Sequence, residues 1–339
     1  MDEGRTCSIG VVIPAHRHHH LLRETLERVA NQTVAPLGAI VVVDGPDPET
    51  ERVARSSGLD CEVLVLPRPT GGPSQPRNEG AKRLLDRHNP DGIWFLDADD
   101  LPDPRFLEVV SRELDRHPGA SMIATRFVDW WEGESLPERS ATNDSNPATE
   151  PIGLDAYLGS TGSILPSFSV LRSSVLTRIR DDGQPFDESI RINNDLDAFV
   201  RSLHLASGIM VDWVGGLYRI HPAGISDSGV RLNLCRSHCT ESLANWFERC
   251  GEPDLANRFR RMMGTSKRKA ARMLWRRNHR GDRRQAFELL SQSVVEDGDL
   301  RSLPLMLTLP FSAAFATRGG SAGGMDTRRS QFERTKSAD

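Results

Sequence analysis

The residues Ile93-Trp94-Phe95-Leu96 form a short apolar run that leads directly into Asp97-Ala98-Asp99-Asp100. Such a run predicts a strand buried on both faces of a sheet. In an open parallel sheet, ligands bind at the carboxyl ends of the strands, where these acidic residues follow. Successive residues of an extended chain point to opposite sides, so Asp97 and Asp99 can point the same way. The two carboxylates predict a site for Mg²⁺ or Mn²⁺, and the alternative is a solvated acidic turn.

Three earlier apolar runs have the same character. They span residues 8–13, 39–43 and 61–66, and helical patterns at residues 21–30, 48–57 and 77–88 follow them in turn. Strands that are apolar throughout and alternate with helices indicate a parallel sheet covered on both faces. The first hundred residues therefore predict the α/β class.

A second acidic strand end, Asp44, should lie at the same edge of the sheet as Asp97, although Asp44-Gly45-Pro46 is also typical of a simple turn. Between them, residues 71–80 combine a flexible loop with the N-terminus of a helix and place Arg77 in its first turn, an arrangement suited to an anion. The chain has neither a Walker A nor a GxGxxG pattern, which argues against P-loop NTPases and dinucleotide-dependent redox enzymes.

Taken together, these blocks resemble family 2 glycosyltransferases of the GT-A fold. Their order and spacing match as a set, and the resemblance covers roughly residues 7–226. It implies a Rossmann-like, mainly parallel sheet and a metal-dependent, inverting transfer from a nucleotide-diphosphate sugar to a carbohydrate or glycolipid acceptor. The matching blocks are Val11-Val12-Ile13-Pro14-Ala15, Val42-Val43-Asp44-Gly45, Gly72-Pro73-Ser74-Gln75-Pro76-Arg77-Asn78-Glu79-Gly80, Phe95-Leu96-Asp97-Ala98-Asp99-Asp100, Gly183-Gln184-Pro185-Phe186-Asp187-Glu188, Asn194-Asp195-Leu196-Asp197 and Tyr218-Arg219-Ile220-His221-Pro222.

The resemblance implies a donor-binding role for five residues. Asp44 would hold the nucleobase beside the backbone of Pro14 and Ala15. Asp97 would hold the ribose or the hydration shell of the metal. Arg77 would lie near the donor phosphates or brace Asp97.

The resemblance also implies the metal ligand and the general base. Asp99 would bind Mn²⁺ or Mg²⁺ and, through the ion, the diphosphate, while His221 would assist the metal or the diphosphate. Asp195 would take the proton of the acceptor hydroxyl. The family usually has Glu-Asp here, and Asn194 replaces the Glu, so Asp195 is the only acid of the pair. Asp197 is the fallback, but two residues further into a helix it should point elsewhere.

Two other functions remain open. Asn194 also allows a catalytically silent subunit that only binds a nucleotide sugar. A nucleotidyltransferase would share the metal carboxylates but needs a basic triphosphate-binding loop after the first strand, and residues 16–20 make a poor one. The histidines in that segment are expected to line the donor pocket rather than bind zinc.

Two further groups of residues allow more than one interpretation. Cys235, His238 and Cys239 suggest zinc, but the helical spacing of the two cysteines favours core packing. Trp130 and Trp131 are predicted either to stack on an acceptor sugar or to pack in the core.

Charge is distributed unevenly along the chain. Residues 258–284 contain twelve Lys and Arg and one acid, a local net charge of +11 in a protein of net charge −4. We predict a glycosyltransferase domain over residues 1–228, a helical basic region over residues 229–318 and a disordered tail over residues 319–339. The basic stretch is either a bundle helix with a solvated face or a peripheral contact with an anionic membrane through residues 258–284.

Composition narrows the setting of this 339-residue protein. The near-neutral charge balance and the lack of interleaved aromatics beyond Trp275 in the basic stretch argue against a nucleic-acid partner. Five widely spread cysteines favour a reducing compartment. No apolar run approaches the roughly 20 residues of a spanning helix. We therefore expect a cytoplasmic protein, with peripheral contact at the inner face of the membrane as a further expectation.

Overall fold

The computed structural model describes residues 6–17, 19–137, 146–221, 229–277, 279, 281–295 and 297–306. The chain divides into two compact units, Met1–Met263 and Gly264–Asp339, and the boundary falls within helix α9 (Pro253–Arg277). The predicted functional boundary after residue 228 stays a prediction. The tail predicted at residues 319–339 lies outside the described residues.

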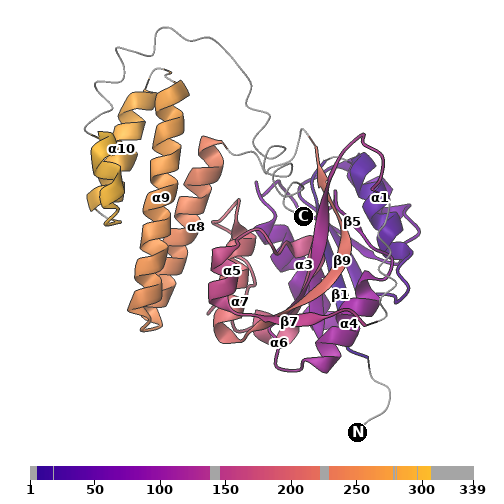
Figure 1. Cartoon of the computed structure of the whole chain (residues 1–339). Helices are drawn as coiled ribbons and strands as arrows, with labels where there is room; N and C mark the ends of the chain where they lie inside the picture. The colour runs from indigo at the N-terminus through magenta and orange to yellow at the C-terminus, as the bar shows by residue number, and fades with distance from the viewer. Residues whose placement is uncertain are drawn as a thin grey trace. The chain divides into compact units, whose positions relative to one another are not determined.

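Four parallel strands form the first half of the sheet in the larger unit. They are β1 (Ile9–Ala15), β2 (Gly38–Val43), β3 (Glu62–Val65) and β4 (Gly92–Phe95), in the spatial order β3-β2-β1-β4. Strand β1 is labelled in Figure 1. The parallel sheet expected from the first hundred residues is confirmed. Strand β1 continues through Pro14, which we expected to end it, because the Ala15 carbonyl still accepts the N–H of Asp44 at 2.8 Å.

The second half of the sheet mixes parallel and antiparallel pairs. Strand β8 (Ser169–Arg172) runs antiparallel to both β4 and β6 (Met122–Trp131), and β9 (Gly208–Ile220) runs parallel to β6. The short strands β5 (Leu101–Pro102) and β7 (Thr149–Ile152) pair antiparallel with β9. Because β8 is antiparallel to both of its neighbours, β4 and β6 run in the same direction, and β9 runs in that direction too. Trp131 and His221 therefore reach the edge of the sheet at which Asp97 follows β4.

Helices cover both faces of this sheet, because alternate strand residues belong to two separate cores. One core joins Val12, Ile40 and Phe95 to α3 (Ser74–Arg87), α7 (Asn194–Leu205) and α8 (Val230–Arg249). The other joins Val11, Val41 and Trp94 to α1 (His19–Ala30), α2 (Pro48–Arg55) and α4 (Phe106–Arg116). The remaining elements of this unit are α5 (Leu154–Gly159), the 3₁₀ turn η1 (Pro166–Phe168) and α6 (Ser173–Leu176).

Helix α3 lies very close to β1. A Cβ atom on Gly80 would come within 2.4 Å of a methyl group of Val12, so only glycine allows this approach. The contact presses the N-terminal part of α3, which carries Arg77, against the sheet. Asp97 continues the side-chain alternation of Phe95, so its carboxylate turns toward α3 and α7.

The smaller unit contains the C-terminal part of α9, helix α10 (Asp282–Val295) and the 3₁₀ turn η2 (Leu300–Ser302). Its buried polar contacts tie the segment after α10 to α9, since Lys267 Nζ donates to Asp297 Oδ1 at 3.0 Å and Arg268 pairs with Asp299. Among the helices formed by the described residues, none has the length and apolar character that crossing a bilayer requires.

Candidate functional site

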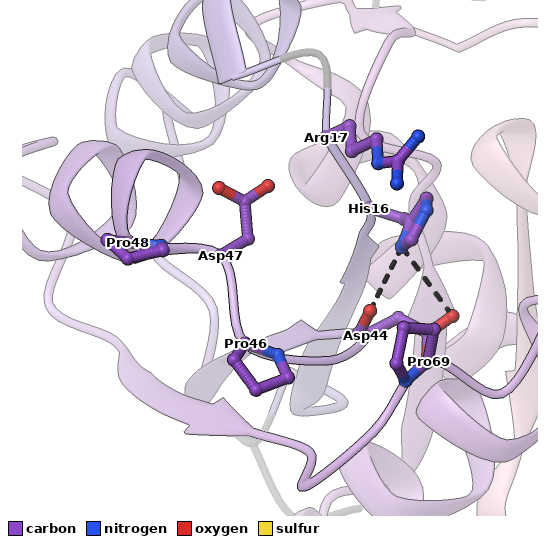
Figure 2. A pocket seen from close by; sticks show the side chains of 7 residues that line it. All are labelled: His16, Arg17, Asp44, Pro46, Asp47, Pro48 and Pro69. Carbon is purple, nitrogen blue, oxygen red and sulfur yellow. Dashed lines mark hydrogen bonds and ion pairs between the residues drawn. The ribbon is translucent and has the colours of Figure 1, made fainter.

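Asp44 lies at the base of an opening at the carboxyl ends of β1 and β2. The opening has a volume of about 280 Å³ and is lined by His16, Arg17, Asp44, Pro46, Asp47, Pro48 and Pro69 (Figure 2). Asp44 is buried, and its Oδ1 accepts the backbone N–H of Thr70 at 2.8 Å. His16 Nδ1 lies 2.9 Å from the Asp44 carbonyl oxygen and 3.9 Å from Oδ2. The carboxylate is therefore held in one orientation, with its second oxygen near the imidazole.

Asp47, on the far side of the same opening, has two roles. Its Oδ1 accepts the N–H of Thr50 and caps helix α2. Despite a contribution from burial in the opposite direction, hydrogen bonds from Thr50 hold the pKa of Asp47 below its ordinary value. Two carboxylates thus border an opening large enough for a heterocyclic base, and one of them is committed to the helix.

The buried Arg77 forms an ion pair with the half-buried Asp97 at the carboxyl end of β4. Arg77 is 3% exposed, and its Nη2 donates to Asp97 Oδ1 at 2.5 Å. Its Nη1 donates to Asn194 Oδ1 at 3.0 Å, and the Asn194 amide donates to Ser74 Oγ at 2.8 Å. The guanidinium also lies 5.2 Å from the centre of the Phe186 ring. Of the two roles considered for Arg77, the contacts are those of a brace on Asp97.

The environment of Asp97 is strongly electrostatic. Burial is the largest influence raising its pKa, and the negative charges of Asp99 and Asp195 raise it further, while Arg77 acts in the opposite sense. Its backbone N–H donates to Ser167 Oγ at 3.1 Å, which anchors the start of the acidic segment on η1. Asp97 and Asp195 are thus electrostatic neighbours across the gap between β4 and α7.

Asp99 and His221 form the second pair, although 122 residues separate them along the chain. Their Oδ2 and Nε2 atoms lie 2.9 Å apart, and this hydrogen bond raises the pKa of His221 above its ordinary value. Two adjacent ligand atoms on an octahedral cation with bonds of about 2.1 Å are separated by roughly 3 Å as well. A carboxylate oxygen and an imidazole nitrogen are both ligands of divalent cations, so the pair fits such an ion.

The pair alone does not enclose a metal. Within the ranges that the structure describes, no three His, Cys, Asp or Glu side chains come together as a metal-binding group. A divalent cation held by Asp99 and His221 would therefore keep several positions for oxygens of a bound ligand or water. This is the usual state of Mg²⁺ at phosphate-binding sites.

Arg219 is a site residue that the sequence did not single out. Its Nε donates to the Asp99 carbonyl at 2.7 Å, it pairs with Glu24 of α1, and its guanidinium lies 5.1 Å from the centre of the Trp130 ring. The backbone N–H of Arg219 donates to Asp100 Oδ1 at 3.0 Å. Its position two residues before His221, in the Tyr218-Arg219-Ile220-His221 block, was the available signal.

Asp195 and Asp197 lie in the first turn of α7 and have different surroundings. Asp195 is half-exposed. Asp197 is fully buried, and its carboxylate accepts hydrogen bonds from Arg201 at 2.9 and 3.0 Å and from Arg180 at 3.3 Å. Asp197 is therefore a structural ion-pair partner, and the expectation that it points away from Asp195 agrees with this contact.

The structure brings the predicted residues together as two groups at one edge of the sheet. Asp44 lies with the ends of β1 and β2, next to Pro14 and Ala15, whereas Asp97, Asp99, Arg77 and His221 surround the end of β4. Cys239 is buried in the core, and its Sγ donates to the Asn193 carbonyl at 3.2 Å. Trp130 is half-buried under Arg219, while the side chain of Trp131 is 40% exposed. His18 lies outside the described residues.

Comparison with known proteins assigns this arrangement to a family. The model of "Glycosyl transferase family 2" matches residues 10–180, which contain the ends of β1, β2 and β4. A glucosyl-dolichyl phosphate glucuronosyltransferase of Haloferax volcanii is 28% identical over 135 residues, which are 39% of this chain and 42% of that protein. The chain therefore spans less than half the length of this relative.

Solved structures share the fold at low sequence identity. The structure of S. aureus TarS in complex with UDP has a TM-score of 0.60 at 14% identity, and the match covers 91% of this chain and 88% of the TarS chain. The mannosyltransferase PcManGT of Pyrobaculum calidifontis, in complex with GDP-Man and Mn²⁺, has a TM-score of 0.50 at 12% identity and covers 92% and 87%. The α/β class and the GT-A fold expected from the sequence are confirmed. With half of its length matched by the family model, the chain belongs to glycosyl transferase family 2.

Proposed function

We propose that this glycosyltransferase is a metal-dependent, inverting enzyme that transfers a sugar from a nucleotide-diphosphate donor to a hydroxyl group. The observation that carries the proposal is the contact of 2.9 Å between Asp99 and His221, beside the braced Asp97 and at the carboxyl edge of the sheet. An acidic and an imidazole ligand at this edge suit a cation that binds a diphosphate.

The nucleobase would occupy the opening above Asp44. The carboxylate is buried and oriented by Thr70, so it can accept an N–H of a base with little loss of side-chain entropy. The rings of His16, Pro46 and Pro69 give the opening apolar walls (Figure 2). The structural relatives solved with UDP and with GDP-Man support a nucleotide donor.

Asp99 and His221 would hold Mn²⁺ or Mg²⁺. When bound, the cation would neutralise charge that develops on the leaving diphosphate. Asp97, kept in place by Arg77, would bind the ribose or the water shell of the ion. The mannosyltransferase solved with Mn²⁺ supports the use of a divalent cation.

Asp195 would act as the general base. Its carboxylate takes the proton from the acceptor hydroxyl as the acceptor oxygen forms a bond to the anomeric carbon. The bond between that carbon and the diphosphate oxygen breaks on the opposite face, which inverts the configuration. A half-exposed carboxylate at a helix N-terminus can meet an incoming hydroxyl, which the buried Asp197 cannot.

We infer that the acceptor is a carbohydrate or glycolipid of polysaccharide or glycoconjugate synthesis. We also infer that the enzyme works in the cytoplasm and that residues 258–284 contact the inner face of the membrane. The relative named for a dolichyl-phosphate-linked acceptor supports a lipid-borne substrate. The net charge of +11 in the basic stretch supports contact with anionic lipid.

The direct test is hydrolysis of a panel of nucleotide sugars in Mn²⁺ without acceptor. Slow release of free nucleotide diphosphate that an Asp99→Ala variant loses would support the transferase. Tight donor binding without turnover in any member of the panel would instead indicate a silent binding subunit.

A further inference from the structure

The smaller unit carries exposed basic side chains on α9 and in the turn η2. Lys269, Arg272 and Arg276 are exposed on α9, and their spacing of three and four residues places them on one face of the helix. Arg301, in η2, is also exposed. Among the described residues, no carboxylate lies within ion-pair distance of these four side chains.

The ion pairs of Asp297 and Asp299 explain how η2 reaches this face. Asp299 pairs with Arg268 and also accepts the hydroxyl hydrogens of Ser293 at 3.3 Å and Ser302 at 3.2 Å. Arg301 follows two residues later, which holds it near α9. In addition to burial, repulsion from Arg272 and Arg301 lowers the pKa of Arg268, so the charges of all three arginines interact.

Without a bound anion, this concentration of positive charge destabilises the smaller unit. Like charges at positions i and i+4 of a helix, such as Arg268 with Arg272 and Arg272 with Arg276, destabilise it. The described carboxylates of the turn neutralise Lys267 and Arg268 only. An anion bound between Arg272 and Arg301 would remove the repulsion.

Exposed apolar side chains flank the same turn. Leu300 is 68% exposed and Leu303 is 40% exposed, on either side of Arg301. The sequence continues from residue 303 as Leu-Pro-Leu-Met-Leu-Thr-Leu-Pro-Phe. A soluble phosphate would explain the arginines but not the adjoining leucines, whereas a lipid surface offers both a phosphate and an apolar layer.

We propose that Arg272 and Arg301 bind phosphate groups of an anionic phospholipid bilayer while Leu300 and Leu303 enter its interface. Lys269 adds long-range attraction. This surface specifies the side chains of the membrane contact in the proposed function, and it would bring the enzyme to a membrane-borne acceptor, so it rests on that function. The binding itself does not depend on the proposed transfer reaction.

The test is sedimentation of the full chain with vesicles of phosphatidylcholine that contain about one third phosphatidylglycerol. A basic residue near an anionic surface strengthens binding about fivefold, so the double variant R272Q/R301Q should bind roughly 30-fold more weakly. The double variant R52Q/R55Q changes the net charge equally on the exposed helix α2 and should bind like the natural chain. The variant L300S/L303S should also bind more weakly.

Three results of the vesicle experiment would overturn the proposal. These are unchanged vesicle binding by R272Q/R301Q, an equal loss in R52Q/R55Q, or equal binding to vesicles of pure phosphatidylcholine. A thermal unfolding experiment gives a further test. If inorganic phosphate raises the unfolding temperature of the chain as much as the vesicles do, the ligand is a soluble anion and the proposal is wrong. Nucleotide-sugar hydrolysis without vesicles should be unchanged in R272Q/R301Q, so loss of membrane binding is separable from failure of the proposed reaction.

Discussion

Asn194 accepts a hydrogen bond of 3.0 Å from the guanidinium of Arg77, which in turn donates to Asp97. The family usually has a glutamate at this position. Here the position holds a neutral amide, which accepts a hydrogen bond from a buried arginine. The negative charges of Asp99 and Asp195 already act unfavourably on Asp97, the partner of this guanidinium. A further carboxylate would add to that repulsion, so the amide is the better electrostatic match here.

The first prediction concerns this support. Asn194→Ala leaves a buried N–H of Arg77 without its acceptor, which should lower the free energy of unfolding by about 1–3 kcal/mol. Because Asp97 would lose its fixed orientation, the KM for the donor should rise about tenfold. Asn31→Ala, at an exposed position directly after α1, is the matched control and should change neither quantity. An unchanged donor KM in Asn194→Ala would refute the positioning role.

The second prediction separates the two acids of α7. Asp195→Asn should lower kcat about 10²–10⁴-fold while the Kd for the donor changes little, because only the base is removed. Asp197→Asn removes the buried partner of Arg201 and should cost about 3–5 kcal/mol of stability. The folded fraction of Asp197→Asn should keep most of its turnover. A larger loss of kcat in Asp197→Asn than in Asp195→Asn would reverse the assignment.

The third prediction concerns the cation. Mn²⁺ should increase the thermal stabilisation that a nucleotide diphosphate gives the protein, because a ligand that binds only the native state stabilises it by mass action. EDTA should abolish the increase, and Asp99→Ala and His221→Ala should each reduce it. Asp103→Ala, four residues beyond Asp99, is the control. Equal nucleotide binding with Mn²⁺ and with EDTA would argue against the metal site.

The fourth prediction concerns the opening at Asp44. Asp44→Asn exchanges one acceptor oxygen for a donor at a buried site, so nucleotide affinity should fall about tenfold or more. Asp47→Asn keeps a good helix cap and should bind nucleotide nearly as well. Calorimetric titration with the nucleotide diphosphate measures both. Similar losses in the two variants would mean that charge around the opening, rather than Asp44 itself, governs binding.

The fifth prediction concerns pH and the smaller unit. Hydrogen bonds from Arg277 lower the pKa of Asp282 from 3.8 to about 2. A depressed carboxyl pKa stabilises the folded state above the unfolded pKa, and this contribution is lost as the pH falls from about 4 to about 2. Asp282→Asn should therefore unfold at a lower temperature than the natural chain at pH 6. The difference should shrink below pH 4, and a difference independent of pH would contradict the assignment.

Much of the fold and part of the site can be predicted from the sequence. The apolar runs of β1, β2 and β4 predict parallel strands because only strands covered on both faces are apolar throughout. Parallel strands end at one edge, so Asp44 and Asp97 were expected together. The antiparallel pairings of β8 were not foreseen, since a strand of four residues carries no signal of its direction.

The sequence by itself determined the class of fold, the edge at which ligands bind and the acids that follow its strands, because these depend on side-chain periodicity over a few residues. Only the tertiary structure decided that Asn194 accepts a hydrogen bond from Arg77 and that His221 contacts Asp99. It also decided that Arg301 lies close enough to Arg268 to act, together with Arg272, on its pKa. The first two contacts join residues 117 and 122 positions apart, and their geometry is set by how helices and strands pack rather than by local sequence.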